Sequence, residues 1–364
     1  MQENAQRVKL ELLCRGVRLP LDLLSRFPGY RHKRASLSEG LCFDLSFPGL
    51  PGAVPVNLAA RERFVARSPF SFDPGSGMIL KDGEPFVRAV LVEPPAWYAE
   101  TLPDGTAFQE IFQVHHRTIL ATALANFCAF RARGGGCAFC ALGPGGSPAR
   151  VKDPARLAEV LRELKARGLS FSEVNVNSGT LETGERTLAA YEAAVSAVRS
   201  VVDWPVYVQL CPPDDPDAER RLADAGVDSL SYNLEIWDEE RRRELIPEKA
   251  ALGRERYLSA LARASRVLGR GQASSWLIAG LEPVESTLEG IRAVAAAGAV
   301  PFVTVFRPLL GSRMENALPP EPDVVEPVFE YLARILASER LFPARTRAGC
   351  VKCGCCTAWA GEPA

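Results

Sequence analysis

The sequence predicts an α/β protein whose central part is a parallel β-sheet of six strands. From about residue 116 onward, short apolar runs alternate with longer amphipathic segments, which is the pattern of strands and helices in succession. Glycines fall between a predicted helix and the next predicted strand at four places where helix C-caps are expected, namely Gly168, Gly226, Gly269 and Gly298. Alternation at this spacing requires right-handed βαβ crossovers, and these produce a parallel sheet.

The six expected strands cover residues 118–127, 171–177, 206–211, 229–235, 273–278 and 302–306. The expected helices cover residues 154–167, 185–201, 217–225, 238–245, 254–268 and 285–297. The first of these helices has the clearest start, because Asp153 is a favourable N-cap and Pro154 fits the first helical position. Ligands of parallel α/β folds bind beyond the carboxyl ends of the strands, so a site is expected in the loops that follow them.

Regions of different character flank this central part, which is expected to span residues 116–315. Residues 1–115 are predicted to form a small, mixed, β-rich N-terminal cap, with a helix over 4–15 and apolar runs at 41–47, 54–58, 78–80 and 86–92. Asp82-Gly83 separates two of these runs and is a hairpin signal. Residues 316–364 are predicted to form a tail with a proline-rich linker, a helix over 324–341 and a cysteine-rich end.

Composition narrows the classes of function. The chain has 364 residues, of which 47% are hydrophobic and 24% charged, and a formal net charge of −1, which gives no support for a nucleic-acid or anionic-membrane partner. Its longest apolar stretches are too short to span a bilayer, and no signal peptide is apparent at its start. Ten cysteines, mostly in two groups and without a secretion signal, indicate a reducing, cytoplasmic location and metal binding.

The first cysteine group has the order C-x8-C-x2-C and consists of Cys128, Cys137 and Cys140. The close pair can bind one metal or one cluster edge from a single tight turn, and the glycine run 134–136 lets the loop fold back toward Cys128. Three thiolates are one fewer than the four of an ordinary iron–sulfur or structural zinc site, so a cluster held here would keep one iron open. The ordinary alternative is a zinc knuckle or a set of buried free cysteines.

The segment Cys137-Ala138-Phe139-Cys140 resembles the C-x-Φ-C half of the radical S-adenosylmethionine (radical SAM) motif, in which Φ is aromatic. The first gap is longer than in the usual C-x3-C-x2-C motif, and the loop resembles that of a nitrilase-associated group with stretched gaps. The resemblance implies a partial (β/α)6 TIM-like barrel. It also implies a [4Fe–4S] cluster whose open iron chelates SAM, and whose electron cleaves SAM to a 5′-deoxyadenosyl radical that attacks a small organic substrate. An external electron donor such as flavodoxin or ferredoxin is implied as a partner.

The same resemblance assigns the SAM contacts to residues at the ends of the predicted strands. The aromatic ring of Phe139 is expected beside adenine. The segment after the second strand is expected at the SAM amine, and consists of Asn177, Ser178, Gly179 and Thr180. Glu235 resembles the carboxylate that contacts the ribose or amine, Gly280 belongs to a turn similar to the one against adenine, and Arg307 is expected to bind a carboxylate. Taken singly, each has an ordinary alternative as a surface ion-pair member or a capping loop.

Lys249 lies in a segment that resembles biotin-synthase-like members, where it would bind SAM or a substrate carboxylate, with a solvated helix-end lysine as the alternative. The remaining single cysteines, Cys14, Cys42 and Cys211, are interpreted as packing residues, with the alternative for Cys211 that it faces the cavity from the end of the third strand. The paired histidines His115 and His116 are expected to be structural, at the bottom of the barrel or against the cap.

The second cysteine group has the order C-x2-C-x-C-C and consists of Cys350, Cys353, Cys355 and Cys356. Four thiols within seven residues are enough for a second iron–sulfur cluster or a zinc ion, and the sequence does not choose between them. The leading hypothesis is therefore a radical SAM enzyme. The alternative is a zinc- or cluster-binding barrel with a structural or electron-transfer role and no SAM cleavage.

Overall fold

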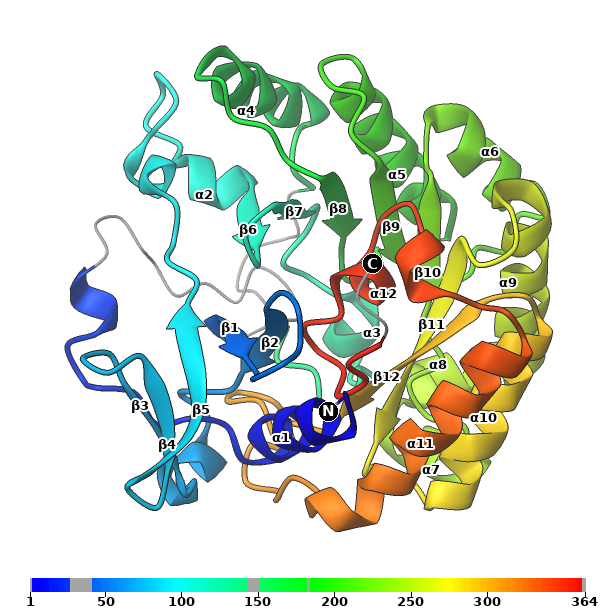
Figure 1. Cartoon of the computed structure of the whole chain (residues 1–364). Helices are drawn as coiled ribbons and strands as arrows, with labels where there is room; N and C mark the ends of the chain where they lie inside the picture. The colour runs from blue at the N-terminus through cyan, green and yellow to red at the C-terminus, as the bar shows by residue number, and fades with distance from the viewer. Residues whose placement is uncertain (1, 27–40, 143–150, 182–183, 362–364) are drawn as a thin grey trace.

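Two β-sheets form the framework of the computed structural model, which describes residues 2–26, 41–142, 151–181 and 184–361 (Figure 1). Among these residues the larger sheet has seven strands in the order β12-β11-β10-β9-β8-β7-β6. Its strands are β6 (Gln113–His115), β7 (Ile119–Ala123), β8 (Glu173–Asn177), β9 (Val206–Leu210), β10 (Ser229–Tyr232), β11 (Ala273–Ala279) and β12 (Val300–Val305). Strands β7 to β12 pair in parallel and β6 pairs with β7 antiparallel, so the sheet is a curled half-barrel with one strand added at its edge.

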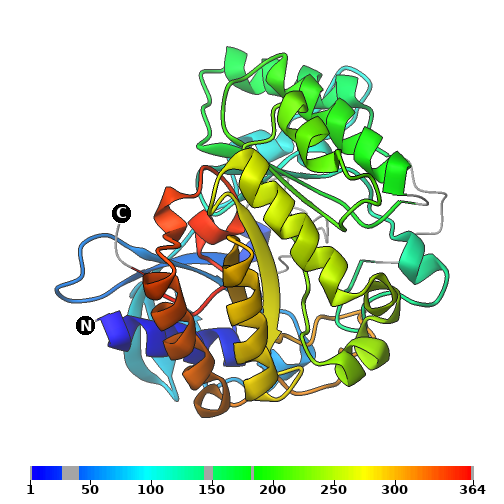
Figure 2. The ribbon, with the colours of Figure 1, turned by 90° about the vertical axis from the view of Figure 1, so that its right-hand side faces the viewer.

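Helices cover the outer face of this sheet (Figure 2). Those of the half-barrel are α3 (Ala129–Ala132), α4 (Pro154–Ala166), α5 (Gly184–Arg199), α6 (Ala218–Ala225), α7 (Glu239–Leu245), α8 (Pro247–Leu252), α9 (Arg254–Leu268) and α10 (Val284–Ala296). The flanking helices are α1 (Gln2–Arg15), α2 (Phe108–Ile111), α11 (Pro322–Ser338) and α12 (Cys350–Cys353). Neighbours along the outside contact one another in chain order, α4 with α5, α5 with α6, α6 with α9, and α10 with both α9 and α11.

Strand β9 shows how the sequence assigns the two faces of the half-barrel. Val206 and Val208 are buried in the hydrophobic core beneath the helices, whereas Gln209 lines a cavity on the other face. Because successive strand residues point to opposite faces, Tyr207 lies on the same side as Gln209. The residues that pair with this inner side are also polar and buried, namely Asn175 of β8, and Ser229 and Ser231 of β10. The outer face is therefore apolar and the interior is polar.

The N-terminal region contains an antiparallel sheet with the strand order β2-β1-β5-β4-β3. Its strands are β1 (Leu41–Ser46), β2 (Val54–Leu58), β3 (Phe70–Asp73), β4 (Met78–Lys81) and β5 (Glu84–Leu91). This sheet docks on the half-barrel through Asp44 of β1, whose carboxylate lies 2.7 Å from the His116 ring and 2.6 Å from the Arg117 guanidinium. Both partners belong to the turn between β6 and β7, so the N-terminal sheet meets the edge of the larger sheet.

The C-terminal tail crosses the open side of the half-barrel, between β12 and the N-terminal sheet (Figure 1). The amide of Asn57 in β2 donates a 2.9 Å hydrogen bond to the Cys355 carbonyl, and the Thr304 hydroxyl of β12 donates one of 2.8 Å to the Cys356 carbonyl. Lys9 of α1 donates a 2.7 Å bond to the Gly354 carbonyl. The tail is thus held by both the N-terminal region and the half-barrel.

The α/β half-barrel, its six parallel strands and the N-terminal β-sheet confirm the predicted fold class. The hairpin at Asp82-Gly83 is present, with φ of 52° and 90° at the two residues. Strands β3 and β6 and helix α8 were missing from the sequence prediction, and the strand expected over 118–127 ends at Ala123. Among the described residues, no helix combines the length and the apolar character needed to cross a bilayer.

Candidate active site

The stretched first gap of the cysteine motif is occupied by one helical turn. Cys128 precedes α3, and the chain then turns back so that Cys137 and Cys140 follow nine and twelve residues later. Two backbone hydrogen bonds of 2.7 Å hold the loop, from the Ala129 amide to the Thr180 carbonyl and from the Ala138 amide to the Leu245 carbonyl. The loop is therefore anchored to the segments that follow β8 and α7, and its extra residues do not separate the three thiols.

The three glycines of this loop have different roles. Gly134 has a φ of 87°, the left-handed conformation that the sequence predicts for the turn. Gly135 and Gly136 are needed for space, because a Cβ would lie 2.4 Å from the Glu248 side chain at the first and 2.7 Å from that of Arg131 at the second. At Gly136 the neighbouring atoms include the Arg131 backbone, so the chain passes too close for a side chain, whereas at Gly135 the flexible Glu248 side chain would have to move.

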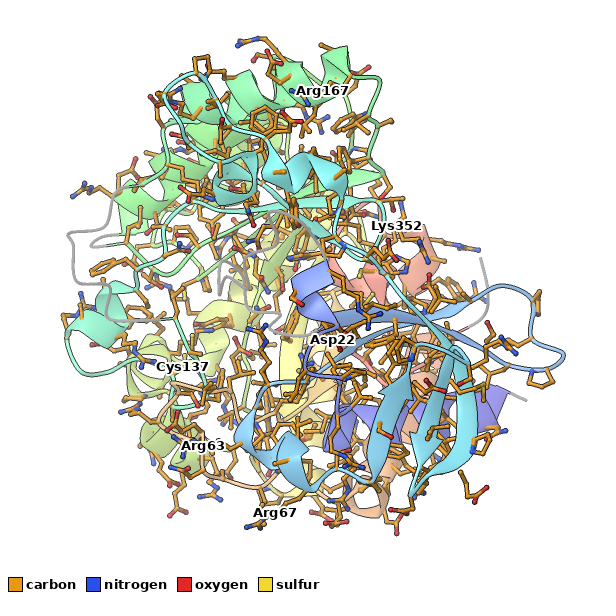
Figure 3. All side chains as sticks on the ribbon, turned by 90° about the vertical axis from the view of Figure 1, so that its left-hand side faces the viewer. Asp22, Arg63, Arg67, Cys137, Arg167 and Lys352 are labelled. Atoms are coloured by element: carbon orange, nitrogen blue, oxygen red, sulfur yellow. The ribbon has the colours of Figure 1, made fainter. Side chains whose placement is uncertain are left out.

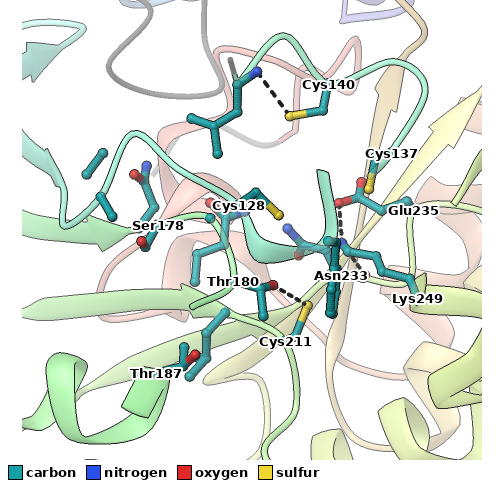
Figure 4. Close-up of a pocket in the computed structure, with 18 of the residues that line it drawn as sticks. Cys128, Cys137, Cys140, Ser178, Thr180, Thr187, Cys211, Asn233, Glu235 and Lys249 are labelled. Carbon is teal, nitrogen blue, oxygen red and sulfur yellow. Dashed lines mark hydrogen bonds and ion pairs between the residues drawn. The ribbon is translucent and has the colours of Figure 1, made fainter. Parts of the chain in front are cut away.

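All three thiols line one cavity inside the carboxyl end of the half-barrel (Figure 4). The cavity contains about 1010 Å³ of space outside protein atoms, including the part open to solvent. It also brings together most of the residues that the sequence assigns to SAM, namely Phe139, Asn177, Ser178, Gly179, Thr180 and Glu235. In Figure 4 the thiols of Cys128, Cys137 and Cys140 approach a common space from different sides. In Figure 3, Cys137 lies between Arg167 and Arg67, which are near opposite ends of the molecule.

Two of the sequence-assigned residues are not among the described residues that line this cavity, Gly280 and Arg307. Gly280 has a φ of 97° and packs against Pro320, where a Cβ would lie 2.6 Å from the proline ring. Arg307 donates two 3.0 Å hydrogen bonds to Asn57, one to its carbonyl and one to its side-chain oxygen. The guanidinium of Arg307 therefore joins the half-barrel to the N-terminal sheet.

Glu235 and Lys249 form a buried ion pair in the cavity wall. Their Oε1 and Nζ atoms are 3.0 Å apart, and Nζ also donates a 3.2 Å bond to the Asn233 carbonyl. Burial acts to lower the pKa of Lys249, but the combined attraction of Glu235, Tyr257 and the nearby thiols outweighs it, and the pKa is raised well above its usual value. Glu235 has a φ of 65°, which is uncommon for a residue other than glycine, and its backbone is held by 2.8 Å bonds to Trp276 and Ile278 of β11.

The cavity also contains polar residues that the sequence analysis missed or treated as packing residues. The Gln209 side chain is 7% exposed, and among the described residues its Nε2 has no hydrogen-bond partner, nor does the Ser178 hydroxyl. Cys211 lies between the hydroxyls of Thr180 and Tyr257, at 3.5 and 3.8 Å from its sulfur. The signal for these residues is strand alternation, because Gln209 and Cys211 follow Tyr207 at intervals of two.

The cysteine trio fits a cluster by its shared cavity and by the environment of its sulfurs. The Leu142 amide donates a 3.4 Å hydrogen bond to the Cys140 sulfur, whereas burial raises the pKa of Cys137 and Cys140, so their thiolates form only when iron displaces the protons. In the described part of the chain, no three His, Cys, Asp or Glu side chains surround a point where a single ion would sit. A four-iron cluster is larger than one ion and binds each thiolate through a different iron, so a cavity with thiols on several sides is suited to it.

The C-terminal cysteines lie outside this cavity. Cys350 and Cys353 are in α12, and Cys355 and Cys356 follow it in the tail. The thiol of Cys355 contacts those of Cys353 and Cys42, so Cys42 of β1 is not the isolated packing residue that the sequence suggests. Contact with Cys355, and hydrogen bonds from Asn57 and the His116 backbone, lower the pKa of Cys42 despite its burial.

A parallel half-barrel with a thiol-lined cavity at the carboxyl ends of its strands defines the class of protein. The chain belongs to the radical SAM superfamily, whose family model matches residues 123–310. This region extends from the end of β7 to the segment after β12, and it includes the whole cysteine trio. Membership implies a [4Fe–4S] cluster and S-adenosylmethionine as cofactors.

Known proteins similar to this chain share only part of its length. Bacteriochlorophyllide c C-7(1)-hydroxylase from Chlorobaculum limnaeum is 28% identical over 130 residues, which are 35% of this chain and 32% of that protein. The match therefore spans about a third of that relative. The structure of the FeFe-hydrogenase maturase HydG from Carboxydothermus hydrogenoformans has a TM-score of 0.48 at 18% identity, covering 61% of this chain and 52% of the other. Methylornithine synthase (PylB) has a TM-score of 0.45 at 17% identity, covering 60% and 62%.

Proposed function

We propose that the protein is an enzyme that cleaves S-adenosylmethionine reductively and directs the resulting radical at a small organic substrate. Cys128, Cys137 and Cys140 would hold the [4Fe–4S] cluster and leave one iron open for SAM. The observation that carries the proposal is that three thiols from one loop share a cavity with the Glu235 carboxylate. A structural metal site would have no need of the uncommitted polar groups that line the same space.

When bound, the cluster supplies the electron, and SAM the cleavable sulfonium, for radical chemistry. The residues of the chain bind SAM and orient it. The carboxylate of Glu235, fixed by Lys249, would accept hydrogen bonds from the ribose hydroxyls or the amine of SAM. The segment 177–180 would meet the SAM amine with small polar groups, and Phe139 would offer its ring to adenine. Gly280 and Arg307 are left out of this set because their contacts are with Pro320 and Asn57.

Two further assignments belong to this proposal. The electron would come from an external donor such as flavodoxin or ferredoxin, with the chain acting in the cytoplasm. The cysteine-rich tail would hold a second iron–sulfur cluster or a zinc ion, with ligands drawn from Cys350, Cys353, Cys355 and Cys356.

Formation of 5′-deoxyadenosine tests the proposal. Protein purified without oxygen is incubated with SAM and dithionite, and the nucleoside is measured by chromatography with mass detection. The wild type is expected to form it and Cys137→Ala to form none, because two thiolates cannot hold the cluster. Cys14→Ala is the matched control, because Cys14 is buried in α1 and belongs to neither cysteine group.

The alternative functions give different results in the same preparation. A colourless, zinc-loaded protein without sulfide would refute the radical mechanism. A brown protein that contains iron and sulfide but forms no 5′-deoxyadenosine would favour electron transfer without SAM cleavage.

A further inference from the structure

Cys42 of the N-terminal sheet faces the cysteine-rich tail. It pairs with Asn57 in the register of β1 and β2, and the Asn57 side chain donates a 3.6 Å hydrogen bond to its sulfur. The same Asn57 donates its backbone amide to the Cys355 carbonyl. One residue of β2 therefore holds both cysteines, and their thiols are in contact. Although 313 residues separate Cys42 from Cys355, the two are neighbours in the fold.

Not all thiols of the tail lie on the side that faces Cys42. Cys355 contacts Cys353 as well as Cys42, and Cys356 is close enough to Cys42 and Cys353 to interact with them electrostatically. Cys350 also acts electrostatically on Cys353 and Cys356, but its thiol lies against Tyr207, on the side of the tail that faces the half-barrel interior. Four thiols thus gather at the junction with the N-terminal sheet, and the fifth is directed elsewhere.

Buried positive charge surrounds this group of thiols. The Lys9 side chain is buried, with 1% exposure, and among the described residues no carboxylate pairs with it. The groups that act on its charge are the thiols of Cys355, Cys353 and Cys356. A second positive charge, the Arg307 guanidinium, interacts electrostatically with Cys356. Burial lowers the pKa of Lys9 to about 8, because an ammonium ion is costly to bury without a counter-ion, so a charged Lys9 needs an anion close by.

Metal binding supplies that anion. Neutral thiols do not compensate a buried cation, whereas thiolates bound to a metal are deprotonated and carry negative charge. We propose that Cys42, Cys353, Cys355 and Cys356 form the four-thiolate site of an iron–sulfur cluster, with Lys9 and Arg307 as its compensating cations and Cys350 outside the ligand set. A cluster binds each thiolate through a different iron, and among the described residues these four thiols do not surround a single-ion site. The inference builds on the proposed second metal site of the tail and is independent of SAM cleavage. The bound centre would therefore cross-link the N-terminal sheet to the C-terminal tail.

Metal analysis of a full-length chain that lacks the first cluster tests the assignment. In Cys128→Ala/Cys137→Ala/Cys140→Ala, purified without oxygen, the remaining iron, sulfide and zinc are measured per chain. About four iron atoms with sulfide are expected. Adding Cys42→Ala is expected to lower the metal content at least tenfold, whereas adding Cys14→Ala or Cys350→Ala leaves it unchanged. Iron with sulfide identifies the four-thiolate cluster.

Four results overturn the assignment: no metal in the triple variant, zinc without iron and sulfide, full metal content with Cys42→Ala, or loss of metal with Cys350→Ala. Circular dichroism checks that each variant is folded. If Cys42→Ala does not fold, Cys42→Asp keeps an anionic ligand and is expected to bind the cluster with an altered electron paramagnetic resonance spectrum. An unaltered spectrum would show that residue 42 is not a ligand. Deoxyadenosine formation by the intact trio is measured separately, so failure of one proposal does not imply failure of the other.

Discussion

Breaking the buried pair of Glu235 and Lys249 should cost far more stability than breaking an exposed pair of similar geometry. At 3.0 Å and an effective dielectric constant of about 20, the Coulomb attraction is about 5 kcal/mol. Replacing Lys249 by Met leaves a buried carboxylate without its partner, at a cost of about 3–5 kcal/mol, and Glu235→Gln similarly leaves a buried ammonium. The double variant leaves neither charge, so we expect it to be destabilised by at least 2 kcal/mol less than the sum of the single variants.

The assay is urea unfolding of the four proteins, prepared without oxygen and followed by circular dichroism. Arg241 and Glu244 provide the control cycle, because their ion pair measures 2.6 Å but their side chains are 47% and 57% exposed. Their coupling energy should be no more than about 0.5 kcal/mol. If the variants of Glu235 and Lys249 were additive within about 0.5 kcal/mol, the pair would not act as a buried unit, and its role in fixing the carboxylate would be refuted.

Three further changes have defined outcomes. Gly179→Ala would place a Cβ 1.9 Å from a backbone oxygen of the cysteine loop, so it should cost about 1–3 kcal/mol in urea unfolding and weaken SAM binding, whereas Gly184→Ala, whose Cβ meets nothing closer than 3.8 Å, should change neither. Burial raises the pKa of Glu173 to about 7 from 4.5, so the native state binds more protons than the unfolded state between these values. Stability should then fall by about 3 kcal/mol as pH rises from 4.5 to 7, and Glu173→Gln should remove that fall; equal pH profiles would contradict this. Arg307→Met removes two hydrogen bonds to Asn57 and should lower stability by about 1–3 kcal/mol while the SAM dissociation constant in calorimetry stays within about twofold; a tenfold loss of affinity would place Arg307 at the cofactor.

The sequence predicts those parts of the fold that depend on local patterns. Helix α4 begins where Asp153 and Pro154 predict, because the cap is formed by adjacent residues and its side chain accepts from Ala155. The short strand β6 was missed because three residues, Gln113–His115, carry too little periodicity to be recognised. It exists because β7 offers it an edge to pair with, which is a property of the folded sheet.

The residues of the candidate site likewise fall into those that a local sequence pattern predicts and those that depend on contacts between distant segments. The cysteine trio was predicted because Cys128, Cys137 and Cys140 belong to one loop. Glu235 was predicted because it follows a strand, and its contact with Lys249 was not, because it depends on how α8 packs. Cys42 could not be assigned from sequence, since nothing in β1 indicates that the tail returns to meet it. Contacts between distant segments depend on how the sheets dock, and no short motif contains that information.

The polar interior of the half-barrel connects the cavity and the tail. Tyr207 and Gln209 lie two residues apart on the inner side of β9, a rise of about 7 Å. Gln209 lines the cavity, while Tyr207 meets the tail so closely that a Cβ on Gly349 would lie 2.5 Å from its ring. One layer of side chains therefore separates the two. A tail held by a four-thiolate centre would keep that layer in place, because the tail closes the half-barrel opposite the cysteine trio. The cross-link at Cys42 would then keep in place the side chains that line the cavity in which the radical is formed.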